Sequence, residues 1–163
     1  MTRQEATSFY RTHSRALYNT ALRIVRDSAE AEEIMQDALM RYFEKGVRSA
    51  SAPQAARWLH TTCVRMCIDA LRRRKKGLET TGVMPPEEIE EEVDMSGTMD
   101  IMQVRTAMER LPEPYSLILD LMLIEGMDYS EIARLTGQKV TTLRSWYSRG
   151  KAKLVKELKA QTI

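Results

Sequence analysis

The residues best suited to chemistry lie between Met127 and Lys153, and their side chains suit the binding of DNA. They are cationic or carry hydroxyl groups, which are the groups that contact DNA phosphates and base edges. In chain order these residues are Lys139, Thr141, Thr142, Arg144, Ser145, Ser148, Arg149, Lys151 and Lys153. Val140, Leu143 and Tyr147 recur among them at intervals of three and four, which predicts the buried stripe of one helix. We therefore expect the other face of this helix to be free to meet a partner.

A shorter helix and a glycine turn must position that face. Asp128 can accept hydrogen bonds from the exposed N–H groups of a first helix, and Glu131 follows at the spacing of a capping box. Gly137 supplies the left-handed conformation that closes a helix and permits a tight turn. These features predict a helix-turn-helix whose second helix enters a DNA groove and continues past Gly150 to about Leu158. An ordinary helical hairpin with a solvated basic face is the alternative.

Charge is segregated along the chain, although the formal net charge is only +2. Basic segments at 65–76 and 134–159 flank the segment 79–94, which holds seven acidic residues and neither Lys nor Arg. Two basic surfaces separated by an acidic tether favour a polyanion that is held at two places.

Helical periodicity dominates elsewhere, with no alternating strand pattern, and predicts an all-α protein of two small helical domains. Helices are expected at about 5–26, 29–45 and 54–74, which can enclose one core in a domain at 1–76. The acidic, Pro-containing segment 77–97 is expected to be a flexible linker. A second domain at 98–163 should add helices at about 100–110 and 115–125, with Ile101 pointing inward, to the helix-turn-helix.

One cluster could suggest an enzyme, because His60, Cys63 and Cys67 share a helix face and a zinc or redox role is geometrically conceivable. The same positions lie on the apolar stripe, so we expect the two thiols to be small buried hydrophobes. No phosphate-binding loop or nucleophile elbow is present. We therefore expect no enzyme activity, no metal and no cofactor. The first residues lack the apolar region of a signal peptide, and no span suits a membrane, which favours a cytoplasmic protein.

Three segments, in this order and at these separations, resemble bacterial RNA polymerase sigma factors of the extracytoplasmic-function group of the sigma-70 family. They are SAEAEEIMQDALMRYFEK (28–45), WLHTTCVRMCIDALRRRKK (58–76) and MERLPEPYSLILDLMLIEGMDYSEIARLTG (108–137). The resemblance implies a sigma-2-like domain at 1–76 and a sigma-4-like domain at 98–163. It further implies a dissociable subunit that binds core RNA polymerase through its β′ and β subunits, recognises −35 and −10 promoter elements and promotes DNA melting.

The helix at 29–45 resembles the one that docks on a coiled coil of the β′ subunit in that family. The resemblance places polymerase contacts on the face away from the apolar stripe, at Glu33, Gln36, Asp37 and Arg41. A solvated helix face with weak ion pairs between neighbouring turns is the alternative.

The loop at 46–53 and the helix that follows resemble the part that reads and melts the −10 element. Holding an extruded base and a freed strand requires a small pocket and nearby cations. The resemblance suggests Arg48, Ser49 and Ser51 for the pocket. For phosphate contacts it suggests Arg57, His60, Thr61, Arg65, Arg72 and Arg73. Val64-Arg65 stands where the family usually has an Arg-Asn pair.

The basic C-terminal helix is expected to occupy the major groove of the −35 element, with Arg144 as the best candidate for a base-edge contact. The chain departs from the family pattern at Gln138, Lys139 and Trp146. Trp146 could lie along a sugar-phosphate edge or meet a protein partner. Family members are commonly held inactive by an anti-sigma factor, so the resemblance implies a partner of that kind.

A rival interpretation is a helix-turn-helix regulator that acts on duplex DNA without replacing a sigma subunit. Such a regulator would bind DNA alone, usually as a dimer on a palindrome. Dependence on RNA polymerase separates the two interpretations.

Overall fold

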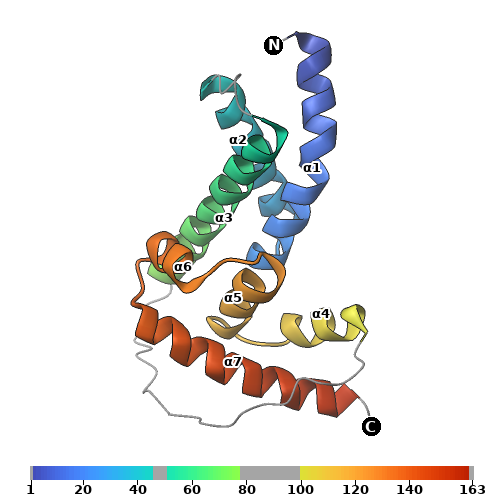
Figure 1. The fold of residues 1–163 in the computed structure, drawn as a ribbon. Helices are drawn as coiled ribbons and strands as arrows, with labels where there is room; N and C mark the ends of the chain where they lie inside the picture. The colour runs from blue at the N-terminus through green and yellow to red at the C-terminus, as the bar shows by residue number, and fades with distance from the viewer. Residues whose placement is uncertain (1, 46–50, 78–99, 162–163) are drawn as a thin grey trace. The chain divides into compact units, whose positions relative to one another are not determined.

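The computed structural model describes residues 2–45, 51–77 and 100–161, and every regular element in these ranges is a helix (Figure 1). The predicted all-α class is thus confirmed. The chain divides into two compact units, Met1–Thr81 (unit 1) and Gly82–Ile163 (unit 2). None of the helices in the described ranges is both long enough and apolar enough to cross a membrane.

Unit 1 consists of three helices that pack against one another, α1 (Arg3–Val25), α2 (Ser28–Lys45) and α3 (Ala52–Gly77). A capping box starts α1: the Thr2 hydroxyl accepts from the Glu5 N–H at 3.1 Å, and the Glu5 carboxylate accepts from the Thr2 N–H at 2.9 Å. The apolar stripes of the three helices meet in one core. Its members include Leu17, Ala21, Ile24, Val25, Ile34, Met35, Leu39, Leu59, Val64, Ile68 and Leu71.

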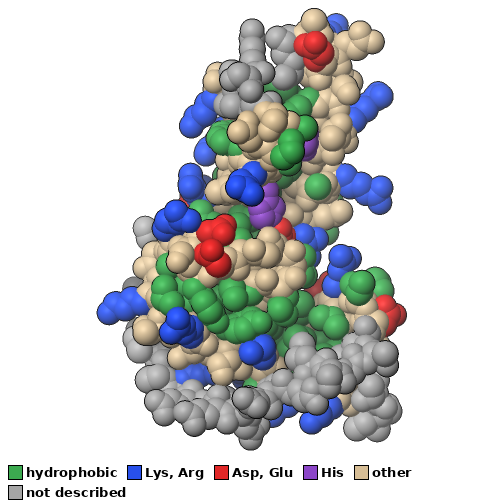
Figure 2. All heavy atoms as spheres, viewed as in Figure 1, with side chains coloured by type: hydrophobic (Ala, Val, Ile, Leu, Met, Phe, Trp, Pro, Cys, Tyr) green, Lys and Arg blue, Asp and Glu red, His purple; other side chains and the backbone are tan. Residues whose placement is uncertain are grey.

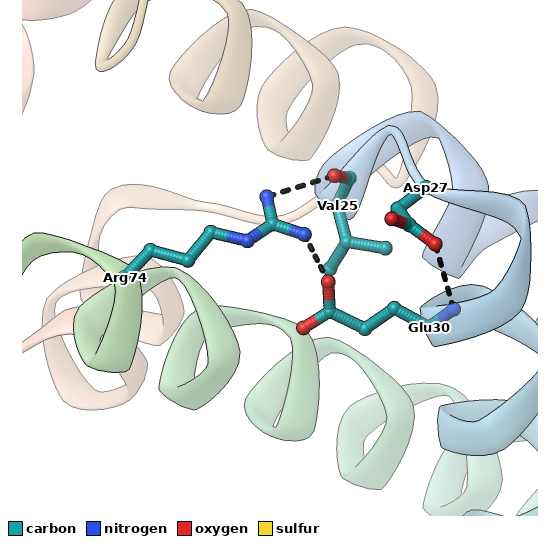
Figure 3. Close-up of polar contacts among 4 residues, drawn as sticks. All are labelled: Val25, Asp27, Glu30 and Arg74. Atoms are coloured by element: carbon teal, nitrogen blue, oxygen red, sulfur yellow. Dashed lines mark hydrogen bonds and ion pairs between the residues drawn. The ribbon is translucent and has the colours of Figure 1, made fainter. Parts of the chain in front are cut away.

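The turn between α1 and α2 is fixed from both sides. Arg26 adopts the left-handed conformation at φ 57°, and Asp27 Oδ1 accepts from the Glu30 N–H at 3.0 Å to cap α2. From α3, Arg74 donates to the Val25 carbonyl at 2.9 Å and forms an ion pair with the Glu30 carboxylate (Figure 3). Arg74 therefore ties the C-terminal half of α3 to the junction of the other two helices, and this side chain serves the fold.

Aromatic side chains from all three helices gather in unit 1. Phe9 stacks on Tyr42 with ring centroids 4.6 Å apart, and Tyr42 meets the Trp58 ring edge-on at 5.6 Å. His13 lies against Phe9 at 4.4 Å, and its partial burial lowers the pKa of the imidazole. Trp58 is half-buried, so it packs against the core while part of its ring stays accessible.

The two cysteines are fully buried, free thiols in α3. Cys63 Sγ lies 3.6 Å from the Leu17 carbonyl oxygen of α1, within range of a weak hydrogen bond. The prediction that both thiols pack as small hydrophobes is confirmed.

Unit 2 contains α4 (Ile101–Glu109), α5 (Tyr115–Leu119), the π-helical turn η1 (Asp120–Ile124), α6 (Tyr129–Thr136) and α7 (Val140–Gln161). The sequence predicts one helix at about 115–125, and the structure instead changes to π-helical hydrogen bonding at Asp120. The inward prediction for Ile101 is wrong, since this side chain is 69% exposed. Ile101 begins a nine-residue helix whose buried residues, Ala107 and Met108, lie near the opposite end.

The longest helix of unit 2, α7, continues through Gly150, as the sequence predicts, and ends at Gln161 rather than near Leu158. It packs on α4, α5 and α6. A Cβ atom at Gly150 would lie 3.3 Å from Leu119 Cγ and 3.5 Å from Tyr115 Cβ. The absence of a side chain at Gly150 thus lets α7 approach α5 closely. This packing fixes the position of α7 and leaves its opposite face exposed.

Candidate nucleic-acid interface

The helix-turn-helix predicted from the sequence is present in α6, the turn at 137–139 and α7. Asp128 Oδ1 accepts from the Glu131 N–H at 2.8 Å and caps α6. Gly137 ends that helix in the left-handed conformation at φ 74°, and its N–H donates to the Ala133 carbonyl at 2.9 Å. Leu143 is fully buried and anchors the first turns of α7 against the unit.

The polar face of α7 is accessible along most of its predicted length. Lys139, Thr141, Arg144 and Lys153 are exposed, and Thr142, Ser145, Trp146, Ser148 and Lys151 are partly exposed. In the view of Figure 2, Lys and Arg side chains stand out along the surfaces of both units rather than in one patch. Lys139, just before α7, and Arg144 in its second turn thus lie near the hydroxyls of Thr141, Thr142 and Ser145 in sequence. Cations and hydroxyls together are the combination used for contacts to phosphates and base edges.

Arg149 does not belong to that face. Its side chain is 6% exposed, so the prediction that it is free to face a partner is wrong. It precedes Gly150, where α7 approaches α5, and a buried guanidinium is tolerated only when its charge is compensated inside the protein. Burial assigns Arg149 to the fold of unit 2.

Sequence reasoning missed an aromatic contribution to the helix-turn-helix. Arg144 Cζ lies 5.7 Å from the centroid of the Tyr129 ring of α6, and Tyr129 meets Tyr147 edge-on at 6.2 Å. Lys151 Nζ lies 4.5 Å from the Tyr147 ring centroid. Partial burial and the neighbouring Tyr147 raise the pKa of Tyr129, although the Arg144 charge opposes this, so the phenol stays neutral near pH 7. The spacing of Arg144, Tyr147 and Lys151, which lie on one helix face, could have indicated that these cations contact an aromatic ring.

In unit 1, α3 arranges four of the nine residues expected at the −10 element along one side. Arg57, Thr61 and Arg65 follow one another at intervals of four, and Arg72 comes seven residues later, which places all four on the same face of the helix. The side chains of Arg57, Arg65, Arg72 and Arg73 are exposed, and those of His60 and Thr61 are half-buried. Arg72 lies 3.8 Å from Asp69 in a solvent-exposed pair, which contributes little to stability.

The base pocket expected at the loop before α3 is only partly within the described residues. Arg48 and Ser49 lie outside them, as does nearly all of the acidic segment 77–97. Ser51 begins α3: its N–H donates to Gln54 Oε1 at 2.9 Å, and its hydroxyl accepts from the Gln54 N–H at 3.4 Å. Ser51 therefore caps the N-terminus of α3. Its predicted role in the base pocket stays a prediction.

The four residues expected to contact RNA polymerase, Glu33, Gln36, Asp37 and Arg41, are all exposed on α2. Glu33, Asp37 and Arg41 line a surface groove between α2 and α3. Arg72 and Arg73 line the same groove, so it brings together residues expected to bind protein and residues expected to bind DNA. Gln36 lies outside it and donates weakly to Glu32 Oε1 at 3.5 Å.

The His60, Cys63 and Cys67 cluster does not form a ligand set. Within residues 2–45, 51–77 and 100–161, no three His, Cys, Asp or Glu side chains come close enough to hold a metal ion. The thiols face the core, as described above, and His60 is half-buried on the same helix.

Comparison with known families gives two matches along the chain. Residues 9–77 match the family model described as sigma-70 region 2, and residues 101–154 match the model described as sigma-70, region 4. The first covers α1 from Phe9 onward and all of α2 and α3, and the second covers unit 2 from the start of α4 to Leu154 of α7.

Several curated proteins are similar over most of the chain. The extracytoplasmic-function RNA polymerase sigma factor SigE of Mycolicibacterium smegmatis is 27% identical over 88% of this chain, which spans 58% of that protein's length. SigM of Mycobacterium tuberculosis is 26% identical over 91% of this chain and 74% of its own length. SigV of Bacillus subtilis, an RNA polymerase sigma factor, is 28% identical over 82% of this chain and 78% of its own length.

Among solved structures, the chain is similar to the sigma factor RpoE of Bartonella quintana, which was solved in complex with the anti-sigma factor NepR. The TM-score is 0.58 at 20% identity, covering 96% of this chain and 98% of that one. At this identity the likeness is one of fold.

Proposed function

The chain belongs to the sigma-70 family, in the extracytoplasmic-function group, and on that premise we propose that it is a dissociable sigma subunit. It binds core RNA polymerase, recognises the −35 and −10 elements of a promoter and promotes DNA melting for transcription initiation. The observation that carries the proposal is the presence, in order, of the region 2 and region 4 matches on two separate helical units.

The two units divide the work in this proposal. The sigma-2-like domain, 1–76, docks on the polymerase through Glu33, Asp37 and Arg41 of α2 and holds the −10 region along the cationic side of α3. The sigma-4-like domain, 98–163, places α7 in the major groove of the −35 element. The acidic segment 77–97 joins them as a linker.

The groove between α2 and α3 supports that division. Its α2 side carries Glu33, Asp37 and Arg41, and its α3 side carries Arg72 and Arg73 together with Asp69. A protein bound to the α2 side would lie next to cations that attract nucleic acid. Polymerase and promoter DNA would thus meet at neighbouring surfaces of unit 1.

The chain itself catalyses no reaction in this proposal, because bond formation belongs to the polymerase. We place the protein in the cytoplasm, where polymerase and promoter DNA are found. An anti-sigma factor is a further proposed partner, by analogy with the similarly folded RpoE, which was solved bound to one.

In vitro transcription with bacterial core RNA polymerase and a genomic promoter library tests the proposal. We expect initiation from a defined set of promoters only when the chain is added, and co-purification of the chain with core polymerase. Absence of both polymerase binding and initiation would contradict the proposal. Sequence-specific binding to duplex DNA without polymerase would instead favour the helix-turn-helix regulator.

Arg144→Ala tests the proposed −35 contact. Removing a guanidinium that contacts a guanine edge should cost about 1–3 kcal/mol of discrimination at one or two base pairs. Lys139→Ala, which removes an exposed cation just before α7, is the matched control and should lower affinity about equally for all sequences. A uniform loss from Arg144→Ala as well would make Arg144 a phosphate contact.

A further inference from the structure

Tyr129 is the first residue of α6, whereas the predicted DNA contacts lie on α7 or just before it. Its ring is partly exposed and is held at the junction of the two helices by the capped start of α6 and by the edge of Tyr147. The planes of the two rings are 84° apart, an edge-to-face arrangement that aromatic pairs favour. The position of the Tyr129 ring is therefore defined by both helices of the motif.

Arg144 lies within reach of the Tyr129 ring. The 5.7 Å from its Cζ atom to the ring centroid is within the range of an attractive cation–π contact. An exposed arginine without such a contact samples many rotamers, and binding must then restrict it. A guanidinium held against a ring keeps N–H groups at its edge available for a bidentate acceptor.

The contact is part of a continuous row of side chains. Arg144, Tyr147 and Lys151 share one face of α7, and Tyr129 of α6 lies between Arg144 and Tyr147. Lys151 lies over the Tyr147 ring at 4.5 Å, so each end of the row is cationic and its centre is aromatic. This arrangement places Arg144 at the edge of the polar face of α7 that is nearest α6.

We propose that Tyr129 is a positioning residue for −35 recognition: its ring holds the Arg144 guanidinium in the orientation that reads a base edge. This inference rests on the proposed sigma function and on Arg144 as a base contact. Tyr129 need not touch DNA itself. Its effect should therefore appear as sequence preference at the base pairs that Arg144 reads, and only when Arg144 is present.

The test uses the full-length chain in holoenzyme with bacterial core RNA polymerase, transcribing from promoters with a randomised −35 element. Tyr129→Leu keeps a large apolar side chain and removes the aromatic face, whereas Tyr129→Phe keeps the face and removes only the hydroxyl. We expect Tyr129→Leu to lower preference at the Arg144-dependent base pairs about two- to fivefold, the equivalent of one cation–π contact at an exposed site. Tyr129→Phe should match the unaltered chain.

A double-mutant cycle distinguishes positioning from a merely structural role. In an Arg144→Ala background, Tyr129→Leu should cause no further loss of preference. An equal loss in both backgrounds, a loss spread over all −35 positions, or a loss in Tyr129→Phe would overturn the inference. The melting temperature and core-polymerase affinity of each variant should equal those of the unaltered chain. A fall in either together with a uniform loss would also overturn the inference, because Tyr129 would then support the fold and not the orientation of Arg144.

The outcomes also separate this inference from the proposed function. If the unaltered holoenzyme shows no −35 preference, both are overturned. If it shows a preference that Arg144→Ala or Tyr129→Leu leaves unchanged, the positioning role alone fails and the sigma function stands.

Discussion

Burial and contacts with other helices decide, one residue at a time, what each cation of this chain does. Arg74 and Arg149 both fall in segments whose charge suggests DNA binding, yet one clamps a helix junction and the other is 6% exposed. Arg144 stays exposed and lies against an aromatic ring. The sequence predicts the basic segments because charge is visible in it, but the long side chain of arginine reaches partners that are distant along the chain.

The cap and turn residues were predictable individually, since they act on their own helix. Asp128 and Gly137 each satisfy backbone groups within a few residues, so a local spacing suffices to find them. Tyr129 and Arg74 were not found in this way. Their roles depend on a second helix, which arrives only when the chain has folded.

His13 should make the stability of unit 1 depend on pH. Burial lowers the pKa of this imidazole in the folded state, so the unfolded chain binds the proton more readily. The stabilisation is complete above the unfolded pKa of about 6.5 and is lost as pH falls through the lower folded pKa. The melting temperature should therefore drop as the pH falls from about 7 through the folded-state pKa of His13.

His13→Phe is the matched variant, because it keeps a ring against Phe9 and removes the titrating group. Thermal unfolding followed by circular dichroism at a series of pH values should show a smaller drop for His13→Phe than for the unaltered chain. Parallel pH profiles for the two proteins would mean that His13 contributes nothing.

Single helices follow their sequence patterns except where another helix intervenes. The three helices of unit 1 and the length of α7 agree with the predicted periodicity, because each helix packs apolar residues against neighbouring helices. The expected helix at 115–125 contains the same apolar residues, yet it becomes π-helical at Asp120. A π-helical turn cannot be predicted from hydrophobic periodicity. The periodicity indicates which face of a helix is buried, but not which backbone groups are hydrogen-bonded to each other.

Gly150 should be required for the packing of α7 on α5. Gly150→Val places a branched side chain where even a Cβ would meet Leu119 Cγ at 3.3 Å, and overpacking of this kind typically costs about 1–3 kcal/mol. Ala152→Val, two residues later at a partly exposed position, is the control and should cost about 0.5 kcal/mol from helix propensity alone. Denaturant unfolding of the two variants measures the difference. Equal costs would show that α5 moves aside freely.

The whole molecule consists of two helical units, each with a buried core of its own. The sequence indicates both units, because two apolar helical regions flank a segment that is too acidic and too poor in large apolar residues to build a core. The resemblance to the sigma-70 family is visible in the sequence from the segments 28–45, 58–76 and 108–137 and their order. Individual DNA contacts do not follow from that order, since exposure and neighbouring side chains determine them.

The two units should fold independently. Fragments 1–81 and 82–163, produced separately, should each show helical circular dichroism and a cooperative thermal transition, because each retains a complete set of packed helices. A fragment that ends after α2 at Lys45 lacks the α3 side of the core and should remain unfolded. Loss of structure in either full unit would show that it depends on the other.

The contact of Arg74 determines how unit 1 responds to a mechanical load. Beyond Gly77 the chain continues towards unit 2, so tension between promoter-bound units would enter unit 1 at the end of α3. Arg74, three residues before that end, is anchored to a carbonyl at the end of α1 and a carboxylate in the first turn of α2. A pull on the end of α3 would therefore also load the end of α1 and the first turn of α2, whereas a helix end without this anchor would bear the load alone.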